Sequence, residues 1–352
     1  MAQEAAFTSS AMATALENSS VSYEDLADIE KEFDDAETEI IRQQVALTAP
    51  LYVKRAEILS KIENFWPLVL EQAPPDIDQF IQPSDSAVLL GSLTSLSVDN
   101  FEITSEGKNG DPRSVAIKFE FSENEYFENK VLEKKFWYRT AADGWSGLVS
   151  EPVKINWKKD KDLTGGLLDL VIKAWEVEQS GSGGATKKGE PNDAQKLLQK
   201  KIEGTGMGGL SFFSWFGFIG RRVTEEVSKE AIKREAAKRK GEKVAEDEPL
   251  TEEQEDQEDL EMSLEIFPDG DDLAIAIAED LWPGAIKYFS KSPFGNCYYP
   301  SEYRANLEIA QAQEQDALSD LDFESGDEDD EAGSFQGLSD DDEAPPLKKM
   351  RS

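Results

Sequence analysis

Carboxylates are the most abundant side chains in this sequence that could take part in chemistry. The chain has 73 Asp and Glu residues but only 37 Lys and Arg residues, which gives a formal net charge of −36. The segment Asp320-Leu-Asp322-Phe-Glu324-Ser-Gly326 begins like a calcium-binding loop, and Glu331 stands at its twelfth place. However, the glycine is at position seven, whereas the sharp turn of that loop requires it at position six, and no apolar helix pattern follows. We therefore expect a solvated acidic segment here and no metal site.

Other catalytic constellations are missing from the sequence. There is no histidine and a single cysteine, Cys297, which excludes Cys/His zinc sites, Ser-His-Asp triads and histidine general bases. The glycine-rich stretch Gly204–Gly209 lacks the Lys-Ser/Thr ending of a phosphate-binding P-loop. Paired catalytic carboxylates need a pocket that shifts one pKa, and no pair stands out among so many. The sequence predicts a protein that is not an enzyme and needs no cofactor.

The composition also restricts compartment and partners. An excess of negative charge attracts cationic partners and repels bare nucleic acid and anionic lipid. One cysteine cannot form an intrachain disulfide, which suits a reducing compartment. Residues 1–21 have no basic start and no apolar run, so they do not resemble a signal peptide, and no stretch of 18 apolar residues occurs. We expect neither sequence-specific nucleic-acid binding nor membrane insertion.

A long amphipathic helix is predicted for residues 22–66. Ser22-Tyr-Glu-Asp25 has the spacing of an N-terminal cap, and apolar residues then recur every three or four positions. Pro50 lies inside the pattern and should bend the helix. Two arrangements fit: an intramolecular bundle with a turn at Ala49-Pro50, or a helix pair formed by two chains. The second predicts a dimer interface along Leu26, Ile29, Phe33, Ile40, Leu47, Leu51, Ile58 and Ile62.

The middle of the chain combines strand and helix patterns, which predicts an α+β fold. An antiparallel meander is expected because the strand patterns follow one another directly and leave one face to pack on helices. Ser211-Phe-Phe-Ser-Trp-Phe216 is an aromatic cluster. The predicted strands are 96–104, 114–121, 131–139 and 153–157, and the predicted helices are 84–94, 163–178 and 273–289.

Polar segments divide this domain and flank it. Residues of about 179–210 and 221–262 are predicted to be flexible or inserted, the second with a solvated basic helix at 223–240 followed by an acidic run. Residues 1–21 are predicted to be disordered. Residues 312–352 have the acid-rich composition of a disordered tail that ends in a basic cluster.

Four stretches in order resemble the nucleosome assembly protein family, in particular its SET (template-activating factor) branch. Pro50–Trp66 is similar to the end of the SET dimerisation helix, with a proline inside the helix. Phe121–Leu132 resembles the family's strand-and-turn motif, and Ser211–Phe216 and Glu279–Phe289 resemble the two motifs that follow it. Two departures from the SET pattern are an interval of roughly 60 residues between the last two motifs and a longer, more apolar stretch at 163–209.

The resemblance implies a homodimer built on the long helix, 22–66, and an "earmuff" histone-binding domain at 67–311 with an antiparallel sheet and packed helices. It implies a histone chaperone that binds core histones, H3–H4, H2A–H2B or both, for nucleosome assembly and for histone storage or transfer. An alternative is an acidic regulatory scaffold that inhibits a phosphatase or supports a histone acetyltransferase. The resemblance also favours nuclear localisation, with shuttling to the cytoplasm as an open alternative. Three basic clusters are candidate import signals: Arg221-Arg222, Lys238-Arg-Lys240 and Pro345–Arg351.

A chaperone of this kind has to screen histone Lys and Arg side chains that otherwise bind DNA phosphates. Flexible acidic runs do this as a competing polyanion, and a structured acidic surface adds geometry. The tail serines Ser319, Ser325 and Ser339 each have an acid three residues on and are predicted sites for an acidophilic kinase. The predicted histone-binding residues are Glu265, Asp269, Asp271, Asp272, Glu279 and Asp280 in the body, and Asp327, Glu328, Asp329, Asp330, Glu331, Asp340, Asp341, Asp342 and Glu343 in the tail.

Overall fold

A computed structural model describes residues 22–104, 110–180, 191–205, 210–239 and 252–291. All of them belong to the first of two compact units, Met1–Tyr298. Within these ranges, no helix has the length and apolar character needed to cross a membrane, and no group of metal-ligating side chains gathers.

Helix α2, Tyr23–Leu59, opens the described chain. Its start confirms the predicted cap: the Asp25 amide donates to Ser22 Oγ at 3.1 Å, and the Ser22 amide donates back to the Asp25 carboxylate at 2.8 Å. Pro50 lies inside the helix. The predicted end at residue 66 was wrong, because α2 ends at Leu59 and Asn64 turns the chain with a φ of 58°. The turn lets Leu59 enter the core and starts a separate helix, α3, Phe65–Glu71, whose aromatic residues are buried.

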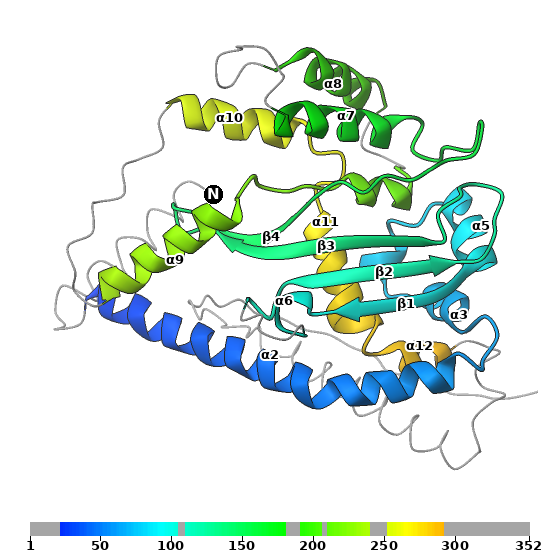
Figure 1. The fold of residues 1–352 in the computed structure, drawn as a ribbon, viewed down its shortest axis with the longest axis horizontal. Coiled ribbons are helices and arrows are strands. Elements are labelled where there is room, and N and C mark those ends of the chain that lie inside the picture. The colour runs from blue at the N-terminus through cyan, green and yellow to red at the C-terminus, as the bar shows by residue number, and fades with distance from the viewer. Residues whose placement is uncertain (1–21, 105–109, 181–190, 206–209, 240–251, 292–352) are drawn as a thin grey trace, which may run out of the picture. The chain divides into compact units, whose positions relative to one another are not determined.

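Four antiparallel strands form one sheet in the order β1-β2-β3-β4 (Figure 1). The strands are β1 Leu93–Asp99, β2 Val115–Phe121, β3 Val131–Thr140 and β4 Ser146–Ser150. The meander was predicted, but two of its strands were not placed correctly. The first ends at Asp99, where a short helix, α6 Phe101–Thr104, takes over. The fourth is not 153–157: the Val153 amide donates to the Phe216 carbonyl at 2.8 Å, so this segment bonds to the aromatic cluster instead of the sheet.

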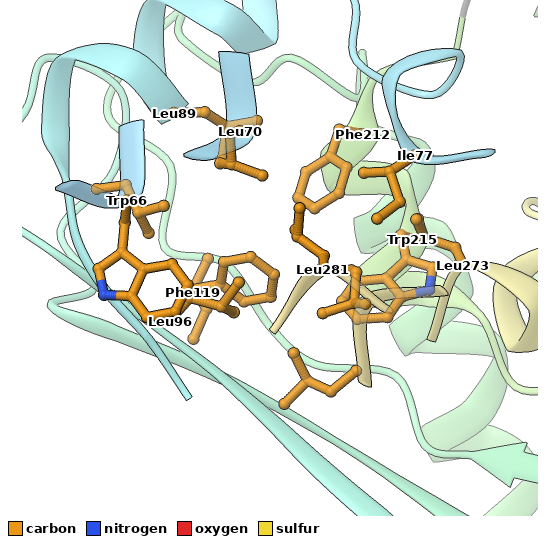
Figure 2. Close-up of a cluster of buried hydrophobic side chains, with 14 of the residues drawn as sticks. Trp66, Leu70, Ile77, Leu89, Leu96, Phe119, Phe212, Trp215, Leu273 and Leu281 are labelled. Atoms are coloured by element: carbon orange, nitrogen blue, oxygen red, sulfur yellow. The ribbon is translucent and has the colours of Figure 1, made fainter. Parts of the chain in front are cut away.

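The two faces of the sheet differ in polarity. Register places Ile117 opposite Lys134 and Phe119 opposite Leu132 on the covered face. The other face carries ion pairs between side chains on the same strand, such as Lys118 with Glu120. Figure 2 shows how the covered face packs: Phe119 and Leu96 of the sheet meet residues from the helices and from the aromatic cluster in one continuous core.

Helices supply the rest of that core and a smaller second one. In the second core, Leu167, Val171 and Leu198 join helices α7 and α8. Predicted inserted segments therefore contain regular helices: α8 lies within 179–210, α9 lies within 221–262, and α10 begins in that second segment and ends one residue beyond it, at Ser263. The remaining helices are α4 Pro75–Asp78, α5 Pro83–Ser92, α7 Leu167–Gln179, α8 Asp193–Thr205, α9 Glu225–Arg239, α10 Glu252–Ser263, α11 Gly270–Ile275, the π-helical η2 Ala276–Leu281 and α12 Ala285–Lys291.

The aromatic cluster is a buried 3₁₀ helix, η1 Phe212–Gly217. Asp85 of α5 holds its start, accepting from Ser211 Oγ at 2.6 Å and from the Phe212 amide at 2.7 Å. Such bonds to a carboxylate are stronger than neutral ones. They satisfy backbone groups that η1 cannot satisfy by itself in the core.

Lys134 of β3 holds the other end of the cluster although it is fully buried. Its ammonium donates to the backbone carbonyls of Glu151 at 3.0 Å, Phe216 at 3.3 Å and Phe218 at 2.8 Å. Burial lowers the pKa of Lys134 to about 7, against the opposing influence of Glu265 and Glu151. In the sequence, this role is indicated only by the place of a lysine on the apolar face of a predicted strand.

Replacing Lys134 with methionine should destabilise the protein by about 3 kcal/mol or more, because three backbone carbonyls, two of them in buried hydrogen bonds, lose their donor. Denaturant unfolding measures the change. Lys135→Met on the exposed face of the same strand is the matched control, and it should change stability by less than about 0.5 kcal/mol. Equal effects of the two substitutions would contradict the anchoring role.

The pH dependence of this effect has a defined sign. The pKa of Lys134 is about 7 in the fold against an ordinary 10.5, so the unfolded chain binds more protons between these values. The wild type should therefore gain stability over Lys134→Met as pH rises above 7, by about 1.4 kcal/mol per unit. A stability difference that shrinks between pH 7 and pH 9 would contradict the lowered pKa.

Candidate functional site

The acidic segment of the body is a continuous run of helix formed by α11 and η2. Its apolar side chains, Leu273, Ile277 and Leu281, are buried under the sheet, so the acids between them face outward. Close packing fixes the start of this helix at Gly270, where an added Cβ would lie 2.3 Å from Cγ of Phe218. The Gly270 carbonyl also accepts a hydrogen bond from Trp215 Nε1 at 2.7 Å. The aromatic cluster thus positions the acidic helix.

The predicted body acids on this helix keep different environments. Asp269, Asp272, Glu279 and Asp280 are exposed. Asp271 is half-buried, and burial, with help from the neighbouring Asp272 and Asp269 carboxylates, raises its pKa. These five residues extend from the residue before α11 to the last turn of η2 and remain candidates for binding a cation-rich partner.

Glu265 has a different place from the one its sequence context suggested. Its carboxylate accepts from the backbone amides of Ile219 at 3.0 Å, Gly220 at 3.1 Å and Phe267 at 3.0 Å. A carboxylate with three amide donors serves the fold, since it satisfies the loop that follows η1. We therefore do not include Glu265 in the acidic surface.

The predicted tail acids and the serines Ser319, Ser325 and Ser339 lie outside the described residues. Their roles stay predictions.

Two exposed acids that sequence reasoning did not select join the surface. Asp76 and Asp78 belong to α4, which contacts η2, and the Phe80 ring lies 5.0 Å from the Phe267 ring. Asp76 also acts on Tyr288: the tyrosine hydroxyl donates to Asp280 at 2.6 Å, and burial, Asp280 and Asp76 together raise the pKa of Tyr288. The carboxylates of α4 and η2 are therefore close neighbours.

The two stretches of sequence that supply these acids contain no basic residues. Neither residues 62–107 nor residues 244–286 contain a single Lys or Arg. The fold brings the two stretches together, through α4 on η2 and through Phe65 of α3, whose ring stacks 4.7 Å from that of Phe289. We refer to the exposed acids Asp76, Asp78, Asp269, Asp272, Glu279 and Asp280, together with the half-buried Asp271, as the acidic face.

Helix α2 is attached to the end of the acidic helix by one arginine. The guanidinium of Arg55 lies 4.6 Å from both the Tyr52 and the Trp282 ring centroids, which are 4.0 Å apart. It donates to the Trp282 carbonyl at 2.7 Å and to the Pro283 carbonyl at 3.2 Å. Arg55 is thereby committed to holding the long helix against the body.

The predicted dimer stripe of α2 borders this attachment, since Leu51 lies four residues before Arg55 and Ile58 three residues after it. Seven of its residues are exposed, with Phe33 at 67% and Leu47 at 74%. Ile62 differs, because it lies beyond the end of α2 and packs half-buried against the core. The exposed members are Leu26, Ile29, Phe33, Ile40, Leu47, Leu51 and Ile58.

Comparison with known proteins identifies the fold's family. Residues 59–292 match the sequence profile of the nucleosome assembly protein (NAP) family. This chain belongs to that family. A nucleosome assembly protein of Schizosaccharomyces pombe is 39% identical over 152 residues, 40% of this chain and 59% of the relative. The protein SET of Drosophila melanogaster is 36% identical over 129 residues, 33% of this chain and 41% of the relative. The matches thus span about two-fifths to three-fifths of these relatives.

Two solved structures align with more of the chain's length. The crystal structure of Ccp1 covers 79% of this chain and 97% of its own, at 27% identity and a TM-score of 0.45. That of Vps75 covers 76% of this chain and 96% of its own, at 23% identity and a TM-score of 0.48.

Removing the Arg55 side chain should loosen the attachment of α2. Arg55→Met loses two hydrogen bonds to carbonyls and a double ring contact, which predicts a loss of about 1–3 kcal/mol in unfolding free energy. Hydrogen exchange should also speed up in residues 52–59. Lys54→Met, at an exposed neighbour, is the control and should leave both measurements unchanged. Unaltered exchange in Arg55→Met would show that other contacts hold the helix.

Proposed function

We propose that this NAP-family chain is a histone chaperone whose acidic face binds core histones for nucleosome assembly and for histone storage or transfer. The observation that carries the proposal is the acidic face itself. Its carboxylates come from two stretches that contain no Lys or Arg, and the fold brings these stretches together. A cluster of carboxylates of this kind on an ordered scaffold suits a strongly cationic protein partner.

The mechanism follows from competition with DNA. Histones bind DNA mainly by neutralising phosphates, a contact that weakens steeply as salt rises. Carboxylates on the acidic face occupy the same Lys and Arg side chains and keep them from non-specific nucleic-acid contacts. Release remains possible because exposed ion pairs are individually weak. No covalent bond is made or broken when histones bind and leave, so the proposed activity needs no catalytic residue and no cofactor.

Body and tail have separate parts in this proposal. The acidic face is held rigid by the buried side of α11 and η2, so it gives a fixed spacing of charges. The acid-rich residues 312–343 add charge without a required geometry and raise the local attraction for histones. The body thus supplies selectivity, and the tail supplies long-range attraction that is sensitive to salt.

We also propose that the chain acts as a homodimer through α2. Seven large apolar side chains along one stripe of α2 are exposed in the single chain. A contiguous apolar stripe of this length on a charged helix is unfavourable in water, and a second α2 with the same stripe would cover it. The nucleus is the proposed site of action, since that is where histones are assembled on DNA.

Neutralising the acidic face should weaken histone binding at both low and higher salt. The variant carries Asp76→Asn, Asp78→Asn, Asp272→Asn and Glu279→Gln, and the control neutralises four exposed acids of α2: Asp28, Glu30, Glu32 and Glu37. Both lose the same charge, so only position differs. Affinity for purified H2A–H2B and H3–H4 is measured over a salt series. Equal losses in the two variants would mean that net charge alone, without a structured surface, explains binding.

Truncation after Gln315 should have the complementary effect. The acid-rich composition of the tail predicts a contribution through charge alone, so its loss should reduce histone affinity mainly at low salt, where screening is slight. The thermal midpoint should stay within about a degree, because acid-rich segments of this composition bury little surface. Complete loss of binding at every salt concentration would assign recognition to the tail and contradict the role of the acidic face.

The double substitution Phe33→Glu and Ile40→Glu should break the dimer. It places two charges in the stripe that two helices would bury. Light scattering at micromolar concentration should give a two-chain mass for wild type and a one-chain mass or aggregates for the double variant. Glu57→Lys, a charge change on the same helix outside the stripe, should remain dimeric. A one-chain mass for the wild type would exclude the dimer.

A further inference from the structure

A pocket of about 250 Å³ lies at one end of the acidic face, between the segment that joins α4 to α5 and the segment that leads into α11. Ile266 and Phe267 are buried and form its floor. Phe80 and Leu210 are half-buried, so they keep accessible apolar surface along its sides. The Phe80 ring lies 5.0 Å from the Phe267 ring. The interior of the pocket is therefore apolar and partly aromatic.

The rim of the pocket is formed by three exposed residues, Gln79, Pro268 and Asp269. Asp269 precedes α11, a position from which an aspartate side chain commonly caps a helix. Here only its backbone does so, because the Asp269 carbonyl accepts from the Leu273 amide at 3.1 Å and the side chain makes no cap hydrogen bond. Among the described residues, neither an ion pair nor a hydrogen bond engages this carboxylate. It is therefore available to a partner at the mouth of the pocket.

Hydrogen bonds fix both sides of the pocket. The Phe267 amide donates to the Glu265 carboxylate at 3.0 Å, and the Gln82 amide donates to the Asp85 carboxylate at 3.0 Å. Asp85 and Glu265 are also the carboxylates that hold the two ends of the aromatic segment η1. The pocket is thus built into the fold, and a preformed pocket binds with little cost for ordering its walls.

The lining specifies a side chain with an apolar stem and a cationic end. Asp269 is the only charged residue among the eight described residues that line the pocket. An acidic side chain would be repelled by it, and a wholly apolar side chain would remove water from its carboxylate without replacing the lost hydrogen bonds. Lys and Arg side chains fit both requirements, because they bury their stems on apolar surface and keep the charged end near water.

Two features favour arginine over lysine. A guanidinium is planar and stacks on an aromatic face, which the half-buried Phe80 ring provides. It also has five N–H donors, which suit two separate acceptors at the rim, the Asp269 carboxylate and the Gln79 amide oxygen. The ammonium of lysine is a compact and strongly hydrated charge, so it gains less from the aromatic side of the pocket.

We propose that this pocket binds one arginine side chain of a basic protein partner and thereby fixes the position of that partner on the acidic face. The stem packs on Phe80 and Leu210, and the guanidinium bonds to Asp269 at the rim. The proposal rests on the histone-chaperone function proposed above, since histones are the arginine-bearing partner. It adds a selectivity for one type of side chain, which exposed carboxylates attracting positive charge in general do not provide.

Selectivity for arginine can be measured with the full-length protein and two synthetic peptides. Short peptides of alternating Gly and Arg, or of alternating Gly and Lys, have the same length and charge. The wild type should bind the Arg peptide at least threefold more tightly. Asp269→Asn should bring the ratio close to one, whereas Glu279→Gln removes the same charge outside the pocket and should preserve the ratio. A ratio near one in the wild type, or one that survives Asp269→Asn, would overturn the proposal.

Filling the pocket provides the second test and changes no charge. Gln79→Trp should reduce affinity for H2A–H2B or H3–H4 at least fivefold, as expected when an anchoring side chain loses its pocket. Ser84→Trp, at an exposed position of α5 that does not line the pocket, is the matched control and should bind as wild type does. In the unaltered protein, the methyl resonances of Leu210 should shift when the Arg peptide binds. Equal affinities of the two variants, or unshifted resonances, would contradict the assignment.

The two proposals fail in different ways. Wild-type protein that binds no histones would refute the chaperone function. Histone binding that is the same in wild type and in Gln79→Trp would refute only the pocket.

Discussion

Three charged side chains that satisfy the backbone of one aromatic segment hold this structure together. Asp85 accepts from the start of η1, Lys134 donates to the carbonyls at its end, and Glu265 accepts from the two amides that follow. An aromatic segment can enter the core only if its peptide groups find partners there, because an unpaired buried group costs about 1–3 kcal/mol. These residues lie in α5, in β3 and just before α11, so one segment ties together elements distant in sequence.

That arrangement also decides where the negative charge lies. Glu265 and Gly270 hold the chain close beneath the aromatic segment, and the acidic helix begins directly after them. Its apolar side is buried by the same core, which leaves Asp272 and Glu279 no orientation except outward. The exclusion of Lys and Arg from residues 62–107 and 244–286 then matters, because these stretches become neighbours only in the fold. Acids that are separate in the sequence therefore form one acidic face in the folded protein.

Local patterns were readable from the sequence, and contacts between distant segments were not. The Ser22 cap, the alternation in β2 and the helical pattern after Leu273 depend on neighbours within a few residues, and all three were predicted. The strand expected at 153–157 failed because its bonding partner is Phe216, which no local pattern reveals. The same holds for Glu265, which looked like surface charge, and for Asp76, which joins the acidic face through α4. A search for long intervals without Lys or Arg would have identified Asp76 as a candidate.

Helix α2 shows how one element can serve two surfaces without conflict. Its outward stripe, which includes Phe33, Ile40 and Leu47, leaves the side containing Ala49, Tyr52 and Ala56 directed at the body. The exposed stripe and the two residues that contact Trp282, which are Tyr52 and Arg55, are thus different sets of side chains on one helix. Arg55 fixes the rotation of the helix about its axis, since its bonds to the Trp282 and Pro283 carbonyls hold the inner side against the body. A second arginine adds to this attachment, because the Arg42 guanidinium donates to the Gly110 carbonyl at 3.0 Å. Helix α2 is therefore held to the body at two places along its length, and the exposed stripe is directed away from the body by both of them.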